Sequence, residues 1–183
     1  MKGMNKMKNI KIIGCGGAGA KTISYIKNKC IPGAVCIAMD SAEEALSAIN
    51  ADVKVVCNEN IDNTEFAKAI GIAADDAIFI IAGLGGSCGG HLVENATKQI
   101  PGIICCYCIM PYQFEGDARG ENAAITHYRL TSHGVNVVKI DNDEVLSKTL
   151  DEPSGMTVGQ MHESISDYIY KDILKHMEDF ADI

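Results

Sequence analysis

Short apolar runs rich in β-branched residues alternate along the chain with longer stretches in which apolar residues recur every three or four positions. The short runs have the length and composition of strands that are buried on both faces. They are Ile10–Gly14, Val35–Met39, Val53–Cys57, Ala77–Ala82, Ile103–Met110 and Val135–Ile140. The alternation predicts an α/β fold in three layers, with a Rossmann-like parallel sheet between helices, and a ligand site at the carboxyl ends of the strands.

A long amphipathic helix is predicted at about residues 155–180. Its apolar stripe consists of Met161, Ile165, Tyr168, Ile169, Ile173, Met177 and Phe180. Such a stripe is typical of a helix that packs on a sheet, and contact with another protein is the alternative.

The first of two glycine-rich stretches is Gly14–Gly19, with the sequence GCGGAG. Its glycines satisfy the dinucleotide fingerprint G-x-G-x-x-G, and Asp40 closes the next strand, where a ribose-binding acid is expected. Taken alone, this stretch favours an NAD-binding Rossmann protein. A tight turn between strand and helix, without a ligand, is the other interpretation.

Two further loops follow in the same chain. Gly83–Gly90 also lies between an apolar run and a helical pattern, where backbone N–H groups at a helix start can face a phosphate that a Cβ would hold off. The loop that begins at Pro111 carries Glu115, which suits a sugar hydroxyl, and Arg119, whose fork of donors suits a phosphate. An exposed surface pair is the alternative for these two side chains.

In these loops the chain resembles the GTPase domain of the FtsZ and tubulin superfamily, most closely archaeal FtsZ, from Ile10 to about Phe180. The resemblance implies a bound GTP or GDP, with magnesium as an accompanying ion. The positions that it assigns to nucleotide binding are Gly14, Cys15, Gly16, Gly17, Ala18, Lys21, Asp40, Gly83, Gly85, Gly86, Ser87, Cys88, Gly89, Pro111, Glu115, Arg119, Asn142, Gly159 and Glu163.

The resemblance also implies a role for single side chains. Glu115 would contact the ribose, Arg119 the phosphates or sugar, and Asn142 and Glu163 the guanine edge. A carboxylate such as Glu163 can accept from both N1 and N2 of guanine, whereas adenine offers no such pair of donors.

Several positions depart from the family pattern. Ala20-Lys21 replaces Asn-Asn, Asp40–Glu43 replaces N-T-D-A, and His91 stands at the last glycine of the second loop, where it faces either solvent or ligand. Gly159 replaces the base-stacking Phe, and the strand at Val53–Cys57 is expected to lead almost directly into a helix, without the glycine-rich loop that senses the γ-phosphate. Weak affinity for GTP is therefore expected.

Residues 1–9 are expected to be a flexible lead and residues 10–183 a single nucleotide-binding domain that ends in the long central helix, with the second FtsZ domain absent. Because the family's catalytic loop lies at that second domain, hydrolysis is expected to be weak, dependent on a partner or lost. The predicted function is a guanine-nucleotide-binding partner or regulator of full-length FtsZ in cell division, acting with an FtsZ-family protein or as a homo-oligomer. An NAD-binding Rossmann protein and a degenerate domain that acts only through protein contact remain the alternatives.

Composition narrows the classes of partner. The net charge of −8, without a basic stripe, argues against a nucleic-acid partner, and no run approaches the length of a membrane span. The eight cysteines have no second C-x-x-C pair and no paired-histidine spacing beside Cys105–Cys108, which indicates buried thiols in a reducing, cytoplasmic compartment. Cys106 and Cys108 are expected on one face of a strand, and Cys15 and Cys88 are expected to form stabilised thiolates at helix N-termini.

Overall fold

The computed structural model describes residues 9–57, 68, 70–73, 76–100, 102–149 and 155–181. Six strands form one parallel sheet in the order β3-β2-β1-β4-β5-β6. The strands are β1 (Ile10–Cys15), β2 (Ala34–Asp40), β3 (Val53–Val56), β4 (Ala77–Gly83), β5 (Ile103–Ile109) and β6 (Val137–Ile140). The order reverses between β1 and β4, and an open α/β sheet has its ligand crevice at such a point.

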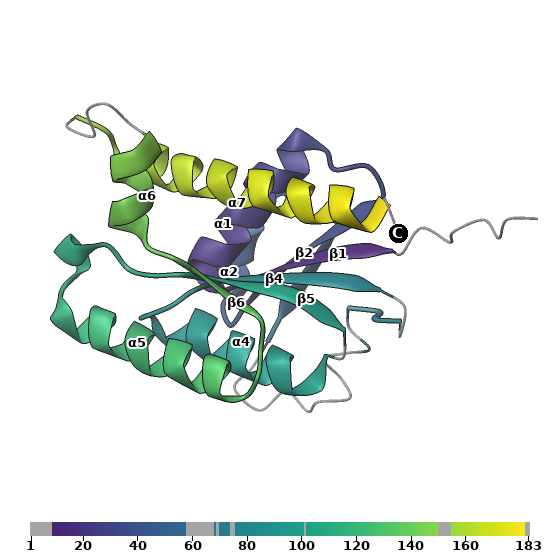
Figure 1. The fold of residues 1–183 in the computed structure, drawn as a ribbon, viewed down its shortest axis with the longest axis horizontal. Helices are drawn as coiled ribbons and strands as arrows, with labels where there is room; N and C mark the ends of the chain where they lie inside the picture. The colour runs from purple at the N-terminus through teal and green to yellow at the C-terminus, as the bar shows by residue number, and fades with distance from the viewer. Residues whose placement is uncertain are drawn as a thin grey trace, which may run out of the picture.

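Helices cover both faces of this sheet, so the described part of the chain forms three layers (Figure 1). Helix α1 and the long α7 lie on one face, with α6 beside the start of α7, whereas α4 and α5 lie on the other face (Figure 1). The helices are α1 (Gly16–Lys29), α2 (Glu43–Ser47), α4 (Ser87–Gln99), α5 (Asp117–Ser132), α6 (Asn142–Thr149) and α7 (Val158–Ala181), with a 3-10 turn η1 at Gln113–Glu115. The three-layer α/β prediction is confirmed.

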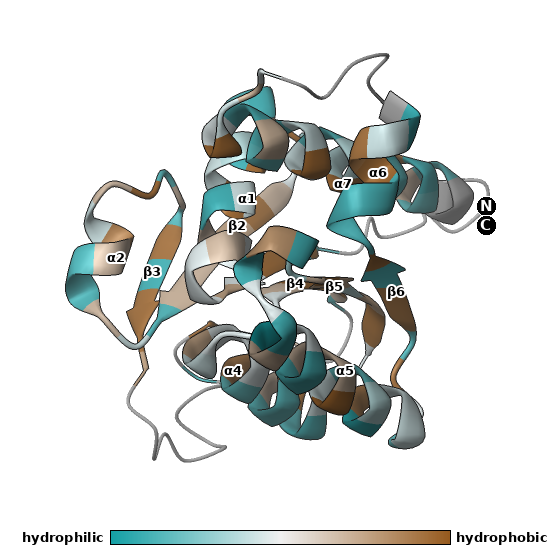
Figure 2. Ribbon diagram, turned by 90° about the vertical axis from the view of Figure 1, so that its left-hand side faces the viewer, coloured by the Kyte–Doolittle hydropathy of each residue, from teal (hydrophilic) through white to brown (hydrophobic). Residues whose placement is uncertain are grey.

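Two apolar cores separate the three layers, because successive residues of a strand point to opposite faces. In β1, Ile12 joins the core under α1 and α7, and Ile13 joins the core over α4 and α5. Figure 2 shows the result, with apolar strands in the centre and polar colours on the outer faces of the helices. Cys106 and Cys108 share the α4 and α5 face, as predicted, with sulfur atoms 3.9 Å apart.

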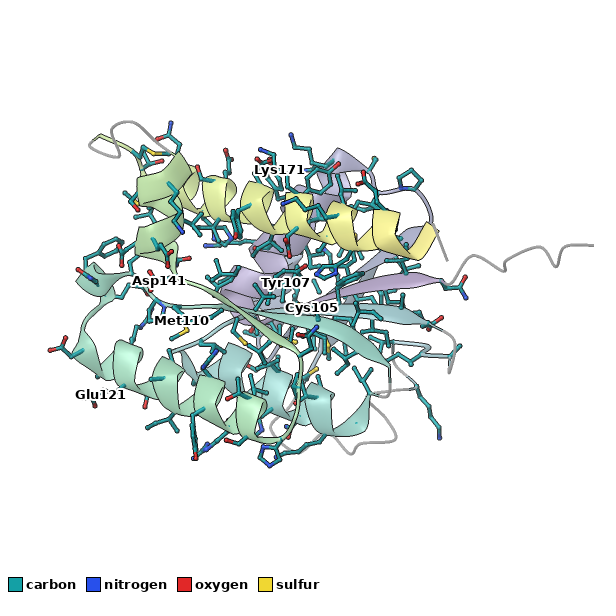
Figure 3. The ribbon with its side chains drawn as sticks, in the orientation of Figure 1. Cys105, Tyr107, Met110, Glu121, Asp141 and Lys171 are labelled. Atoms are coloured by element: carbon teal, nitrogen blue, oxygen red, sulfur yellow. The ribbon has the colours of Figure 1, made fainter. Side chains whose placement is uncertain are left out.

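Polar side chains also join α7 to its neighbours. The Ser166 hydroxyl donates to Thr22 of α1 at 3.2 Å, and both side chains are fully buried. Tyr107 of β5, which Figure 3 shows between the sheet and α7, donates to Asp172 at 3.0 Å. These bonds fix the rotation of α7, and the face that α7 turns toward α1 is therefore defined.

The predicted strand positions are confirmed, with one difference at β6. That strand begins at Val137 and not at Val135, because the Val135 N–H donates to the carbonyl of Leu130 and closes the end of α5. The helix expected directly after β3 falls on residues 58–67, which lie outside the described residues, as do residues 1–8 of the expected lead. Among the described residues, no helix combines the length and apolar character needed to cross a bilayer.

Candidate functional site

The carboxyl ends of β1, β4, β5 and β6 lie at one edge of the sheet and lead into the loops that the sequence singled out. Cys15 is paired with Ala82, Gly83 with Ile109, and Ile109 with Ile140, so these strand ends stand in one row. In Figure 3, Met110 and Asp141 mark this edge next to the beginnings of α5 and α6. Residues far apart in sequence therefore meet where a ligand was expected.

The two glycine loops touch each other. A Cβ at Gly16 would lie 2.7 Å from the Cα of Gly89, and Gly16 has a φ of +71°. A Cβ at Gly89 would in turn strike the carbonyl oxygen of Gly83. Glycine at these positions permits backbone-to-backbone packing between the loops.

Most of the remaining loop glycines also serve packing. A Cβ at Gly14 would meet the Gly19 carbonyl, and one at Gly19 would meet the Ile81 carbonyl of β4. At Gly83 it would lie 2.6 Å from the Cβ of Ala18. At Gly14, Gly19, Gly83 and Gly89, close packing against protein atoms is therefore a sufficient reason for glycine, and nucleotide contact at this loop edge stays a prediction.

Gly17 and Gly86 are different, because a Cβ at either position would meet no atom within 4 Å. Both residues are exposed, and Ser87 beside Gly86 is exposed as well. Helix α1 begins beside Gly17 and α4 begins directly after Gly86. Open space thus lies above the first turns of two helices that contact each other.

The first turns of α1 and α4 have backbone donors without side-chain partners. Neither N-cap residue, Cys15 for α1 or Gly86 for α4, makes a side-chain capping hydrogen bond. Neither helix has an acidic residue in its first turn. Uncapped N–H groups and the positive end of the helix dipole favour an anion at both places.

The third loop brings Glu115 and Arg119 together as an ion pair at the start of α5. Glu115 also accepts from the Tyr112 N–H at 2.9 Å. A Cβ at Gly85 would lie 2.6 Å from the Arg119 carbonyl, so this loop packs against the second glycine loop. Pro111 is half-buried at its beginning. The roles of Glu115 and Arg119 toward ribose and phosphate stay predictions.

Asp40 is buried at the end of β2, where its carboxylate accepts from the Ala42 N–H at 3.1 Å. This bond gives Asp40 a local role in the turn. A ribose contact, which the NAD interpretation requires, would compete with that role.

The predicted base-reading residues stand at the beginnings of α6 and α7. Asn142 is buried, and its Oδ1 has no hydrogen-bond partner among the described residues. Glu163 and Gly159 are exposed on α7, and Glu163 lines a groove of about 580 Å³ together with Tyr25 and Asp167. The structure places Asn142 at the strand edge and Glu163 on an outer surface of α7.

The sequence prediction missed two polar groups at this edge. The Oη of Tyr112 and the Nε2 of His162 are closed off from solvent and, within the described residues, lack partners. Tyr112 lies in the third loop, and its ring stacks on that of Phe114 with the ring centroids 4.9 Å apart. His162 directly precedes Glu163, and this position next to a predicted site residue is the one feature of the sequence that could have pointed to it. Together with Asn142, they are buried polar atoms whose missing hydrogen bonds a ligand could supply.

Lys21 and His91, which depart from the family pattern, are both exposed. His91 Nε2 lies 3.1 Å from the Asn95 side chain, on the surface of α4.

The expected thiolate at Cys15 is wrong. Cys15 is fully buried, and burial, followed by the neighbouring Cys57, Cys88 and Cys108, raises the pKa of its thiol far above the ordinary value. Desolvation therefore outweighs the helix dipole at this position. Cys88 is only partly buried, in the second loop.

Comparison with curated proteins finds archaeal cell division proteins. The chain is 27% identical over 158 residues to FtsZ of Haloferax mediterranei, covering 75% of this chain and 42% of that protein. It is 29% identical over 157 residues to FtsZ 1 of Methanocaldococcus jannaschii, covering 74% and 43%. The chain thus spans about half the length of the curated relatives it matches. No family model matches it.

Comparison with solved structures gives the fold. An FtsZ dimer of M. jannaschii superposes with a TM-score of 0.74 at 24% identity, covering 95% of this chain and 55% of that one. The fold is that of the FtsZ and tubulin GTPase domain. CetZ2 of Haloferax volcanii, in a GTPγS-bound protofilament, gives a TM-score of 0.71 at 18% identity, covering 93% and 58%. The resemblance seen in the loops of this FtsZ-type domain is thereby confirmed at the level of the whole sheet.

Proposed function

We propose that this FtsZ-type domain binds guanine nucleotides, GTP or GDP, at the carboxyl edge of its sheet. The observation that carries the proposal is the contact between the uncapped first turns of α1 and α4, with open space at Gly17 and Gly86. Two adjacent helix starts with bare N–H groups suit a polyphosphate. The CetZ2 neighbour was solved with a guanine nucleotide analogue, which supports the same ligand here.

The unpartnered buried groups support a bound base and sugar. A buried amide oxygen without a partner costs about 1–3 kcal/mol, and a ligand donor would remove that cost. Asn142 Oδ1 is such an atom, and the Tyr112 Oη is a buried hydroxyl oxygen that also lacks a partner among the described residues. In the proposed complex Asn142 meets the guanine edge, and the loop of Glu115 and Arg119 lies toward the sugar and phosphates. Three metal-ligating side chains do not converge anywhere in the described residues, so an accompanying magnesium ion would be held largely by phosphate and water.

Hydrolysis by the isolated chain is proposed to be weak. Glu115, the carboxylate of the third loop, is already engaged by Arg119 and by the Tyr112 N–H, and is not free to orient a water. Assembly with a second copy or with an FtsZ-family protein in cell division belongs to the same proposal, because the curated relatives are cell division proteins and the CetZ2 neighbour is a protofilament.

Isothermal titration of reduced protein with GTP, GDP, ADP and NAD tests the proposal. Binding of the guanine nucleotides alone is expected. Gly86→Trp should abolish it without unfolding the chain, because the space at Gly86 is open. Ser132→Trp, at an exposed position at the far end of α5, is the control for added bulk and should bind normally. NAD binding would favour the Rossmann alternative, and no binding by the wild-type chain would leave an interaction domain.

A further inference from the structure

Helix α5 is attached to the sheet by few residues and leaves large apolar side chains in solvent. Of its 16 residues, only Ala123 and Leu130 are buried. Ile125 is 50% exposed and Tyr128 is 72% exposed. Figure 1 shows α5 as an outer element of its layer, with the sheet on its other side. An apolar pair that is rimmed by polar residues is typical of a protein contact surface.

The exposed residues around Ile125 lie on one side of the helix, because residues three or four apart share a helix face. We call this side the α5 face, and it consists of Glu121, Asn122, Ile125, Tyr128 and Arg129, all of which are exposed. The carboxylate of Glu121 lies about one turn before Ile125, and the guanidinium of Arg129 lies about one turn after it. The two charges of this face are therefore at equal distances from its centre.

Both charges can take a further partner. Glu121 lies on the side of α5 that is turned away from the sheet (Figure 3), and its carboxylate makes no ion pair or hydrogen bond with another described residue. Arg129 contacts Glu94 of α4 through Nη1 alone, at 3.4 Å, and 59% of its side chain is exposed. A guanidinium has five N–H donors, so Arg129 can bind a second carboxylate.

The order of these charges decides which surface fits the α5 face. If a second copy packs its own α5 face antiparallel across Ile125, each Glu121 lies at the level of Arg129 of the other copy. Parallel packing would instead bring Glu121 to Glu121 and Arg129 to Arg129, and like charges disfavour it. The antiparallel arrangement also joins the two Ile125 side chains and brings Tyr128 near Asn122, whose amide can bond to a hydroxyl. The α5 face is thus complementary to itself.

We propose that the chain forms a symmetric homodimer in which the α5 faces of two copies pack antiparallel, centred on Ile125. A two-fold axis at this point makes every contact occur twice. The inference goes beyond the proposed function and does not depend on it, because the α5 face contains none of the predicted nucleotide-binding residues. One helix face is smaller than a standard interface, so a dimer Kd of about 1–100 μM is expected.

Sedimentation velocity over a series of protein concentrations, without nucleotide, measures this dimer. Glu121→Arg and Arg129→Glu should each weaken it at least about tenfold, because each change replaces two attractive charge pairs with two repulsive ones. An equimolar mixture of the two variants should recover an affinity within about threefold of the wild type, since opposite charges then face each other across the interface. A substitution that merely disturbs its own chain would not recover on mixing.

Two further variants test the centre of the face. Ile125→Glu places two carboxylates at the two-fold axis and should abolish the dimer. Tyr168→Glu is the matched control, because Tyr168 is 42% exposed on α7, on the opposite side of the sheet, and this variant should dimerise like the wild type. Circular dichroism melting shows whether each variant is folded. If Arg129→Glu, which stands beside Glu94, does not fold, Ile125→Glu still decides the question.

The outcomes separate this inference from the proposed function. A wild-type chain that stays monomeric up to millimolar concentration refutes the dimer and leaves nucleotide binding to the titrations. A dimer that Ile125→Glu leaves intact uses another surface, and it also refutes the inference. Charge variants that do not recover on mixing would refute the pairing of Glu121 with Arg129. Assembly that requires added GTP would overturn the inference while supporting the proposed function.

Discussion

Gly16→Ala tests whether the contact between the two glycine loops holds the fold together. The substitution places a methyl group 2.7 Å from the Gly89 Cα and 2.8 Å from its nitrogen, at a φ of +71°. The left-handed conformation costs a non-glycine residue about 1–2 kcal/mol, and overpacking against backbone costs about 1–3 kcal/mol more. A loss of about 3 kcal/mol would lower the Tm of a chain of this length by about 6–12 °C.

Gly17→Ala, one residue further along α1, is the matched control. A Cβ at Gly17 meets nothing within 4 Å, and alanine is a better helix former than glycine by about 1 kcal/mol. Its Tm should therefore equal or exceed that of the wild-type chain. Thermal unfolding followed by far-UV circular dichroism, without nucleotide, measures both variants. Equal Tm values for the two variants would refute the packing role assigned to Gly16.

Two further predictions concern a buried ion pair and the cysteine thiols. Asp76 and Lys11 form an ion pair at 3.1 Å at the amino end of the sheet, so Asp76→Ala should cost about 3 kcal/mol in urea unfolding at pH 7. Burial acts to raise the pKa of Asp76, but the Ala73 N–H and Lys11 outweigh it and hold the pKa below its ordinary value. The ionised Asp76 therefore stabilises the folded chain fully above about pH 4, and this stabilisation is lost as the pH falls through the lower pKa of the folded state. In the Asp76→Ala variant the free energy of unfolding should fall less steeply as the pH is lowered. An equally steep fall in the variant would contradict this. For the thiols, iodoacetamide should label the exposed Cys30 at least about tenfold faster than the buried Cys15 in the native chain, as read by peptide mass spectrometry, and equal rates would contradict the assigned burial.

The strands and the location of the site could be predicted from the sequence because both depend on local pattern. Runs such as Ala77–Ala82 are apolar throughout, which is what a strand covered on both faces requires. Once the strands are parallel, their carboxyl ends must share an edge. The state of Cys15 could not be predicted in the same way, because its pKa depends on how completely neighbouring layers exclude water.

The orientation of His162 and Glu163 on α7 shows a second limit of prediction from the sequence. The two residues are adjacent in sequence, and the family pattern selects Glu163 by position. Which of them faces the glycine loop depends on the rotation of α7, and this rotation is fixed by the contacts of Ser166 with Thr22 and of Tyr107 with Asp172. Those partners lie 144 and 65 residues apart along the chain, so no local pattern contains the information.

The packing of the glycine loops decides how substitutions in them can be interpreted. At Gly16 and Gly89, any side chain separates the two loops, so lost nucleotide binding would follow from a changed fold as readily as from a lost phosphate contact. At Gly17 and Gly86 the added atoms enter open space, and the loop backbone need not move. A loss of binding with an unchanged Tm at these two positions would therefore locate the phosphate, because a Cβ at either position meets no protein atom within 4 Å.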